Sequence, residues 1–280
     1  MKNYASERLS MKTNSYNILI AILIAASVLL FAVDATAEVV TQYSFEGNLL
    51  DSAASGTTAD DLTDNAGGVS YVRGIVGQAV AIPDTVDGTN KITAASSDDV
   101  NLAANWTLEA FVWPDADNDS AVEWERFWTK WGDGGEAYHL AFRGAAGVPV
   151  PDGMDLFVNG GNNIINHNST ATVPREEWSH VAFVGDQGAN TIAAWLNGTQ
   201  VGTTDYVAVA PNDGTMSFGN FSAGNQAVFQ YSGYVDEALI HNAAVDSSYL
   251  AERARLIPEP SSGLLLLMPM IGWLLRRRGN

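Results

Sequence analysis

The sequence Trp106-Thr107-Leu108-Glu109-Ala110-Phe111-Val112-Trp113-Pro114 combines aromatic and β-branched residues in one run, a composition that favours a β-strand. Nine further segments share this character: Val39 to Phe45, Val69 to Tyr71, Ala79 to Ile82, Ala137 to Phe142, Asp155 to Val158, His180 to Val184, Thr191 to Leu196, Met216 to Phe218 and Tyr234 to His241. Clusters of Gly, Asn and Asp separate them at a spacing typical of a sandwich. We therefore predict an all-β fold.

Two local signals refine this prediction. Asn197-Gly198, placed between Ile192 to Leu196 and Gln200-Val201-Gly202, is the strongest hairpin signal in the chain. Helical periodicity is convincing only from Ser247 to Leu256. Residues 52–68 and 115–121 are rich in acidic residues or glycine and are predicted to be loops. No repeat or linker divides residues 38–257, so we expect one domain there.

Six segments occur in an order that resembles a known family. They are Tyr43 to Ser52, Gly74 to Val80, Trp106 to Pro114, Glu177 to Val184, Trp195 to Gly198 and Gly233 to Ile240. Together they resemble the laminin-G-like modules of the concanavalin A-like lectin/glucanase superfamily. The resemblance implies a two-sheet antiparallel jelly-roll sandwich. Within it, we expect Trp178 to pack at a strand entrance and His180 to make a hydrogen bond.

The amino-terminal residues 1–37 have the pattern of a secretory signal peptide. An apolar segment from Ile18 to Val33 follows a basic stretch, and Ala35-Thr36-Ala37 supplies a small-x-small site that predicts cleavage before Glu38. An uncleaved anchor is the alternative. The start of translation is either Met1 or Met11.

Residues 258–280 have the pattern of a sorting signal. Pro258-Glu259-Pro260 precedes an apolar run from Gly263 to Leu275, and Arg276-Arg277-Arg278 follow. Thirteen residues reach about 20 Å as a helix, against a hydrocarbon core of about 30 Å. This argues against the alternative, a permanent anchor helix. The arrangement resembles the PEP-CTERM signal read by exosortase, which implies transient inner-membrane tethering and a Gram-negative cell surface or extracellular matrix.

The predicted domain is strongly acidic. The chain has 14 Lys and Arg against 32 Asp and Glu, a net charge of −18. Eight of the basic and 29 of the acidic residues lie in 38–257, so this part carries −21. Such a surface disfavours nucleic acid and favours cations and solubility. Without cysteine, the chain has neither disulfides nor thiolate chemistry.

A structural calcium ion is one hypothesis for this charge. In sandwiches of the resembled family the first and last strands are neighbours, which implies that the turn from Asn48 to Asp51 lies near Asp236. Strand alternation places Asp236 and Glu237 on opposite faces. Asn48, Asp51 and Asp236 would offer the oxygen ligands that Ca²⁺ prefers. The alternative is that these carboxylates cap turn amides.

No catalytic motif is found. Related glycoside hydrolases use paired carboxylates spaced as Glu-x-Asp-x-x-Glu, and this spacing does not occur in the chain. Glu123-Trp124-Glu125 is the nearest approach and has no third acid at the required distance. No Gly-x-Ser-x-Gly elbow, phosphate loop or zinc spacing is present.

An aromatic cluster, Trp124, Phe127, Trp128 and Trp131, could stack on sugar rings. On a strand, Phe127 would face away from Trp128, so one face of this segment is assigned to the core. Trp124 and Trp131 are the candidates for glycan binding, and strand packing is the alternative. We therefore expect an exported, non-catalytic module that binds extracellular glycan or a matrix protein and is sorted by an exosortase-like enzyme. The resemblance implies an association with exopolysaccharide or biofilm. The alternatives are a divergent glycan hydrolase or lyase and a purely structural role.

Overall fold

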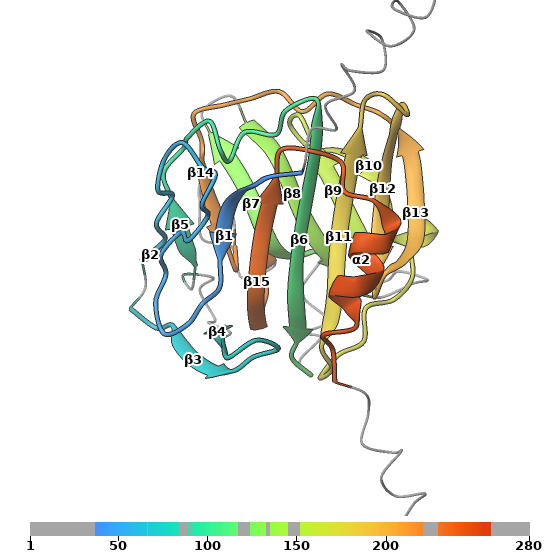
Figure 1. Ribbon diagram of the computed structural model, residues 1–280. Helices are drawn as coiled ribbons and strands as arrows, with labels where there is room; N and C mark the ends of the chain where they lie inside the picture. The colour runs from blue at the N-terminus through green and yellow to red at the C-terminus, as the bar shows by residue number, and fades with distance from the viewer. Residues whose placement is uncertain are drawn as a thin grey trace, which may run out of the picture. The chain divides into compact units, whose positions relative to one another are not determined.

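The computed structural model describes residues 37–65, 67–83, 89, 91–116, 124–132, 135–144, 152–220 and 229–258 (Figure 1). Its strands are β1 (Val39–Tyr43), β2 (Thr63–Asp64), β3 (Ser70–Arg73), β4 (Gln78–Ile82), β5 (Ile92–Ala94), β6 (Asn105–Pro114), β7 (Trp124–Gly132), β8 (Gly135–Arg143), β9 (Met154–Val158), β10 (Asn162–Ile165), β11 (Ser179–Asp186), β12 (Thr191–Leu196), β13 (Thr199–Asp205), β14 (Thr215–Phe218) and β15 (Gly233–His241). A 3₁₀ turn, η1 (His167–Ser169), and one helix, α2 (Ser247–Ala254), complete the described elements.

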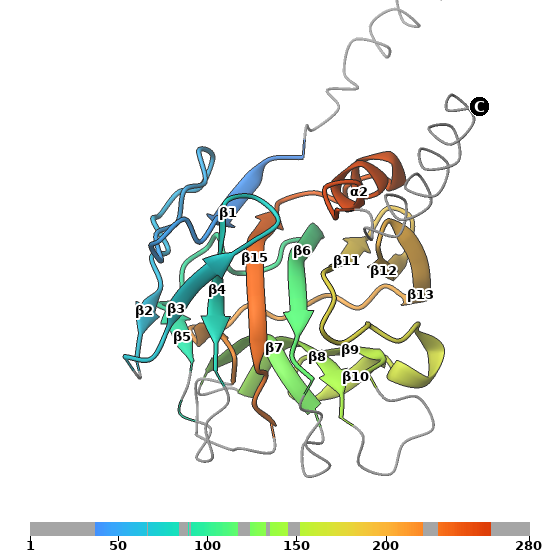
Figure 2. The same ribbon diagram turned by 90° about the horizontal axis from the view of Figure 1, so that it is seen from below.

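The strands form two antiparallel sheets that stack face to face (Figure 2). The first sheet has the order β13-β12-β11-β6-β15-β4-β3, with β1 also paired to β15. The second has the order β10-β9-β8-β7-β14-β5-β2. Helix α2 lies on the outer face of the first sheet (Figure 1). The predicted all-β, two-sheet antiparallel jelly-roll sandwich is thus confirmed.

Local signals in the sequence position several of these elements. All ten predicted strand segments are strands, and β1 pairs with β15 as the resemblance implied. At the β12–β13 turn Asn197 and Gly198 have φ values of 49° and 74°. Both central residues of a tight hairpin turn need positive φ, which explains the Asn-Gly pair. Strands β2, β5 and β10 were not predicted, because two to four residues are too few to show a strand pattern.

The core fills the space between the sheets. Its largest fully buried apolar side chains are Trp106, Trp128, Tyr43, Tyr138, Tyr231, Phe45, Phe127, Phe142, Phe183 and Phe218. Trp128 and Phe218 join β7 to β14 through rings whose centroids lie 4.8 Å apart. Burying each large apolar side chain contributes about 1.5–3 kcal/mol, so this layer supplies the main driving force of folding.

Two bulges change which way side chains point. In β7 the register shifts between Arg126 and Trp128, and Phe127 and Trp128 both pack in the core. The prediction that these two rings face opposite sides is therefore wrong, because a bulge interrupts the two-residue period.

In β15 the register shifts between Asp236 and Leu239, and Glu237 has a φ of 46°. Val235 and Ala238, three residues apart, both face the core. The strict alternation that assigned Asp236 and Glu237 to opposite faces does not hold here.

Within the described residues, no helix is both long and apolar enough to cross a membrane. Several predicted segments lie outside the described residues: positions 1–36 of the predicted signal peptide, the apolar run from Gly263 to Leu275, Glu259, Pro260 and the arginines Arg276, Arg277 and Arg278.

Candidate functional site

The outer face of the second sheet carries a dense group of rings and polar side chains. In β8 the alternation is regular: Tyr138, Leu140 and Phe142 face the core, and His139 and Arg143 face outward. In the cross-strand register His139 is paired with residues 129 and 157, and Arg143 is paired with residue 124. The sheet therefore brings outward-facing residues of β7, β8 and β9 together.

We call Trp124, His139, Arg143, Phe157 and Phe229 the Trp124 cluster. The His139 and Phe157 rings are stacked with centroids 4.1 Å apart. Trp124 contacts Phe157 edge to face and Phe229 at a tilt, each at 6.0 Å. The Arg143 guanidinium carbon lies 4.2 Å from the centre of a Trp124 ring, a cation–π geometry. Trp124, Arg143 and Phe229 are half-buried, so the cluster has a buried floor and an accessible rim.

Several polar atoms of this face have no hydrogen-bond partner among the described residues. They are Nε1 of Trp124, Nε2 of His139, Nε and Nη1 of Arg143, and Oδ1 of Asn163. Asn163 is paired with Phe157 in the β9–β10 register, which places it beside the cluster. A buried polar atom without a partner costs about 1–3 kcal/mol.

The two acids beside the cluster are already engaged. The Glu136 carboxylate lies against Nδ1 of His139. Burial lowers the pKa of His139, and Glu136 opposes this only in part, so the imidazole is neutral at pH 7. The Asp155 carboxylate accepts hydrogen bonds from Asn163 Nδ2 at 2.9 Å and from the His167 amide at 2.8 Å. Neither acid is placed as a free member of a catalytic pair.

The structure does not bring Trp124 and Trp131 together. They stand near opposite ends of β7, seven residues apart, which corresponds to about 23 Å along an extended strand. Trp131 is half-buried and pairs with Thr215 and Glu136 in the register. Lys130 is buried, and its Nζ donates to the Gly214 carbonyl at 2.7 Å, so its charge is used within the fold.

Sequence reasoning missed His139, Arg143, Phe157 and Phe229. The first two were partly detectable: His139 lies in the predicted strand from Ala137 to Phe142, and Arg143 directly follows it, four residues on and therefore on the same face. Phe157 belongs to the cluster only through the β8–β9 register, and Phe229 through the return of the chain to β15. Neither relation has a local signal.

Asn48 and Asp51 shape the turn after β1. The Asp51 carboxylate accepts backbone amides of Gln42, Ala53 and Asp60 at 2.9–3.3 Å. The Asn48 side-chain oxygen accepts the Leu50 amide at 3.0 Å.

Asp236 caps a different turn, between β3 and β4. Its Oδ2 accepts the amides of Ile75 at 2.8 Å and Val76 at 3.0 Å. Asp51 and Asp236 therefore share no hydrogen-bond partner among the described residues, and the two carboxylates are used in separate turns. Among the described residues, no group of three or more His, Cys, Asp or Glu is arranged to hold a metal ion. Calcium binding by Asn48, Asp51 and Asp236 stays a prediction.

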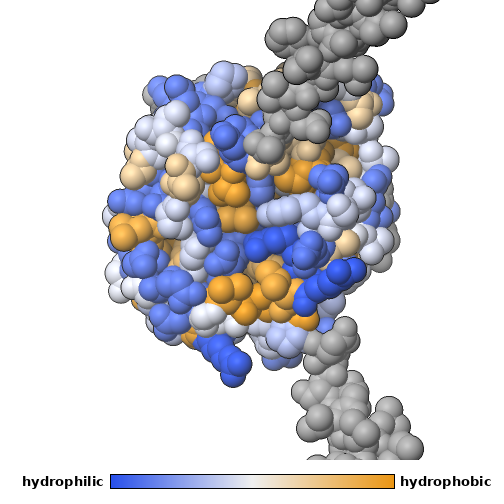
Figure 3. All heavy atoms as spheres, in the orientation of Figure 1, coloured by the Kyte–Doolittle hydropathy of each residue, from blue (hydrophilic) through white to orange (hydrophobic). Residues whose placement is uncertain are grey.

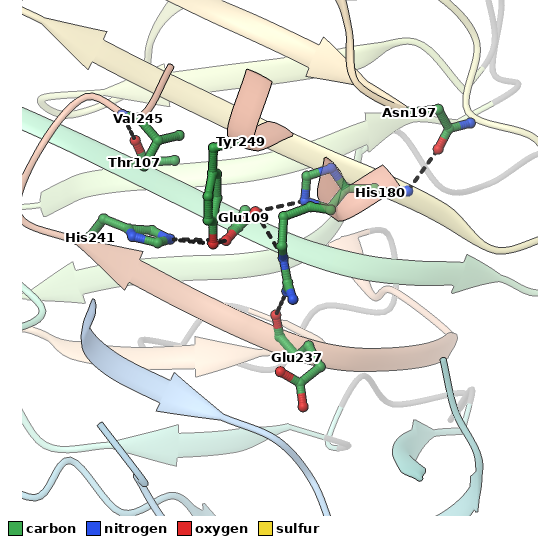
Figure 4. Close-up of polar contacts among 9 residues, drawn as sticks. Thr107, Glu109, His180, Asn197, Glu237, His241, Val245 and Tyr249 are labelled. Atoms are coloured by element: carbon green, nitrogen blue, oxygen red, sulfur yellow. Dashed lines mark hydrogen bonds and ion pairs between the residues drawn. The ribbon is translucent and has the colours of Figure 1, made fainter. Parts of the chain in front are cut away.

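A second polar network lies beneath α2, on the outer face of the first sheet (Figure 4). Nε2 of His180 donates to Glu109 at 2.7 Å, and Nε2 of His241 donates at 2.9 Å. The Tyr249 hydroxyl donates to the same carboxylate at 2.6 Å, and Arg253 lies 3.5 Å from it. Burial alone would raise the pKa of Glu109, but the histidine hydrogen bonds and the Arg253 charge outweigh it and hold this pKa well below its usual range. The network joins three elements to one buried carboxylate, and it confirms a hydrogen bond for His180.

Trp178 packs where β11 begins, as expected. Its ring contacts Trp113 at 5.8 Å and Tyr234 at 6.3 Å. A cavity of about 530 Å³ beside it is lined by Arg73, Gly74, Ile75, Gly77, Trp178 and Pro258. Pro258, the first residue of the predicted sorting signal, thus lies at the surface of the sandwich. Figure 3 shows this face, on which a band of hydrophilic residues separates two apolar areas.

Solved structures with this fold include several binding domains. Domain 4 of a GH43 extracellular arabinanase from Geobacillus stearothermophilus, in complex with arabinotriose, matches with a TM-score of 0.57 and 16% identity, over 78% of this chain and 98% of that domain. The binding domain of Paraclostridial mosquitocidal protein 1 matches with a TM-score of 0.59 and 13% identity, over 78% of this chain and 52% of that chain. The ligand-binding domain of botulinum neurotoxin serotype D, in complex with N-acetylneuraminic acid, matches with a TM-score of 0.59 and 10% identity, over 78% and 50%. The match thus spans about half of each toxin chain, and at these identities the likeness shows the fold alone.

No curated protein sequence matches the chain. The family model of the concanavalin A-like lectin/glucanases superfamily matches residues 86–250. This range holds the strands from β5 to β15 and the start of α2. Because the match covers more than half of the sequence, the chain belongs to the concanavalin A-like lectin/glucanase superfamily.

Proposed function

We propose that this protein is a non-catalytic module that binds extracellular glycan through the Trp124 cluster. The observation that carries the proposal is the group of half-buried aromatic and basic side chains on one sheet face, Trp124, Phe229 and Arg143. A pyranose ring presents an apolar face for an indole and hydroxyls for polar groups. Such a ring fits this combination better than a purely apolar ligand does.

Two further observations support binding over catalysis. Glu136 lies against His139, and Asp155 accepts hydrogen bonds from Asn163 and His167, whereas glycoside hydrolysis needs two carboxylates free to act on the sugar. Glu125 of the Glu123-Trp124-Glu125 segment is buried and pairs with Arg175, while Glu123 lies outside the described residues. Two of the similar structures were solved with an arabinotriose or an N-acetylneuraminic acid ligand.

Export and sorting form the second part of the proposal. The signal-peptide pattern of residues 1–37 and the Pro258-Glu259-Pro260 pattern with its terminal arginines support delivery outside the cytoplasm by an exosortase-like enzyme. The arabinanase with a similar domain is itself extracellular. A glycan or protein of the surrounding matrix would then be the partner, and membrane contact would be transient.

A glycan array with the purified protein, with and without calcium, tests the binding function. We expect saturable binding that Trp124→Ala weakens at least tenfold. Trp131→Ala removes the same side chain from the far end of β7 and should leave binding unchanged. Circular dichroism and melting of both variants verify the fold. Equal binding by the Trp124→Ala variant would contradict the site, and turnover of a polysaccharide panel by the protein would favour the hydrolase or lyase alternative.

A further inference from the structure

We infer that the cavity beside Trp178 is a docking groove for the segment of this chain that follows it, Glu259 to Ser262. The cavity has a volume of about 530 Å³ and lies between the turn that joins β3 to β4 and the start of β11. Pro258 forms part of its lining. The inference is independent of glycan binding by the Trp124 cluster, because that cluster belongs to the other sheet.

The residues after α2 lead the chain to this cavity. The amides of Arg255, Leu256 and Ile257 each donate to the carbonyl three residues earlier, at 3.0–3.2 Å. These hydrogen bonds continue the turn of the helix as far as Ile257, and Pro258 follows on the cavity wall. Glu259 therefore begins at the cavity, and docking of the next residues closes almost no loop.

One wall of the cavity is a tight turn that the fold holds in place. The Asp236 carboxylate accepts the amides of Ile75 at 2.8 Å and Val76 at 3.0 Å. The Gly74 amide donates to the Gly77 carbonyl at 3.0 Å, which closes the turn. A Cβ at Gly74 would lie 2.4 Å from the Asp236 carboxylate, so this position requires glycine. The wall is thus formed before any segment binds.

The other wall is aromatic. The ring of Trp178 contacts those of Trp113 at 5.8 Å and Tyr234 at 6.3 Å, and all three side chains are half-buried. The indole Nε1 of Trp178 makes no hydrogen bond within the described residues. An indole of this kind offers a flat apolar surface and one donor for a peptide carbonyl. Because both walls are preorganised, binding orders little of the protein.

The segment suits these walls in conformation. Proline fixes φ near −65° and restricts the residue before it to extended conformations, so Pro258-Glu259-Pro260 favours an extended, polyproline-like path. Segments of this kind dock in aromatic-lined grooves and lose little conformational freedom when they bind.

The segment also suits the cavity in charge. Arg73 belongs to the cavity lining and makes no ion pair with the described residues. Glu259, between the two prolines, carries the opposite charge. Since the domain is strongly acidic, a basic side chain at this place favours the approach of an acidic segment here over other parts of the surface.

The covalent connection favours this occupant over a free ligand. A short tether gives the segment an effective concentration in about the millimolar range, so that weak contacts are enough to keep it docked. The first part of the predicted sorting signal is then held against the sandwich. An enzyme that acts on this segment has to displace it from the cavity first.

The indole N–H signals of the isotope-labelled full-length protein, observed by NMR, test the docking. The chain has eight tryptophans, and a Trp178→Phe variant identifies the signal of Trp178. We expect Pro260→Ala to shift this signal by more than its line width and to leave the signal of Trp131 in place. Glu259→Gln removes only the charge and should shift the Trp178 signal in the same direction by a smaller amount.

Pro269→Ala is the matched control, because it makes the same substitution in the same tail outside the docked segment. It should leave the Trp178 signal unchanged. An unchanged signal in Pro260→Ala would overturn the inference. A shift that depends on protein concentration would overturn the intramolecular contact and assign the cavity to the segment of a second copy. Loss of glycan binding, read at Trp124, would leave this result untouched.

Discussion

At the scale of single residues, Glu109 shows how much one buried carboxylate organises. It accepts hydrogen bonds from His180, His241 and Tyr249, residues of three different elements. Removing one partner of a buried charged group costs about 3–5 kcal/mol, because the other partners lose their compensation. We expect Glu109→Gln to lower the free energy of unfolding by about 3 kcal/mol, measured by urea titration.

Glu252→Gln is the control for this experiment. Glu252 is an exposed acid of α2, the helix whose Tyr249 donates to Glu109. It should leave the urea midpoint within error of the unmodified protein. The lowered pKa of Glu109 also sets the direction of the pH dependence. Its contribution to stability is present above pH 4.5, the usual value for glutamate, and is lost as the pH falls below it. Equal midpoints for Glu109→Gln and Glu252→Gln would show that the network does not stabilise the fold.

Asp236 has the opposite dependence on pH. Burial raises its pKa to about 7, although the amides of Val76 and Ile75 oppose this, and its Oδ1 is buried without a partner in the described part of the chain. A carboxyl whose pKa is raised in the folded state stabilises it fully below the unfolded value of 3.8. That contribution is lost as the pH rises towards 7.

We therefore expect Asp236→Asn to flatten the loss of stability between pH 4 and pH 7. The Asn side chain retains an oxygen for the two amides and carries no charge. Melting temperatures at half-unit pH steps, with Asp61→Asn as the matched exposed acid, measure the effect. Parallel curves for the unmodified protein and Asp236→Asn would refute this account.

At the scale of elements, α2 is attached by one apolar side chain and by the Glu109 network. Leu250 is fully buried and packs with Ala182 and Val184 on the outer face of the first sheet. Truncating a buried leucine costs about 2–5 kcal/mol. We expect Leu250→Ala to speed amide hydrogen exchange in residues 247–254 more than in β11, whereas Leu256→Ala, at a position 44% exposed, should leave both unchanged. Equal acceleration throughout the sandwich would mean that α2 does not open on its own.

Elements with a complete local signal were the predictable ones. The run from Trp106 to Trp113 and the Asn197-Gly198 turn carry their own conformational preference, and both are as predicted. The bulges at Phe127 and Glu237 carry no such signal, because they depend on which strand lies alongside. The aromatic segment of β7 could be singled out from the sequence, yet only the register adds His139 and Arg143 to Trp124.

At the scale of the whole molecule, the outer faces of the two sheets differ. The outer face of the first sheet is occupied by α2 and its network, and the outer face of the second carries the unpartnered atoms of the Trp124 cluster. This division could not be predicted from the sequence, since His180 and His139 look alike as isolated histidines in strands. The two differ in their partners. His180 shares a charged carboxylate with Tyr249, whereas the ring of His139 stacks on Phe157.

The negative net charge of the whole molecule determines how calcium binding has to be tested. Divalent cations screen a charge of −18 whether or not a site exists, so stabilisation by calcium alone would not distinguish the two cases. A specific site prefers Ca²⁺ to Mg²⁺, because Mg²⁺ demands octahedral geometry and retains its water.

If the predicted site exists, the melting temperature in about 1 mM calcium should exceed that in magnesium at the same concentration. EDTA should reverse this gain, because a ligand that binds only the folded state stabilises it. Asp51→Asn should abolish the difference, and Asp186→Asn, an acid outside the predicted site, should keep it. Equal melting temperatures in calcium, magnesium and EDTA would show that Asp51 and Asp236 only cap their turns, where the amides of Gln42 and Ile75 donate to them.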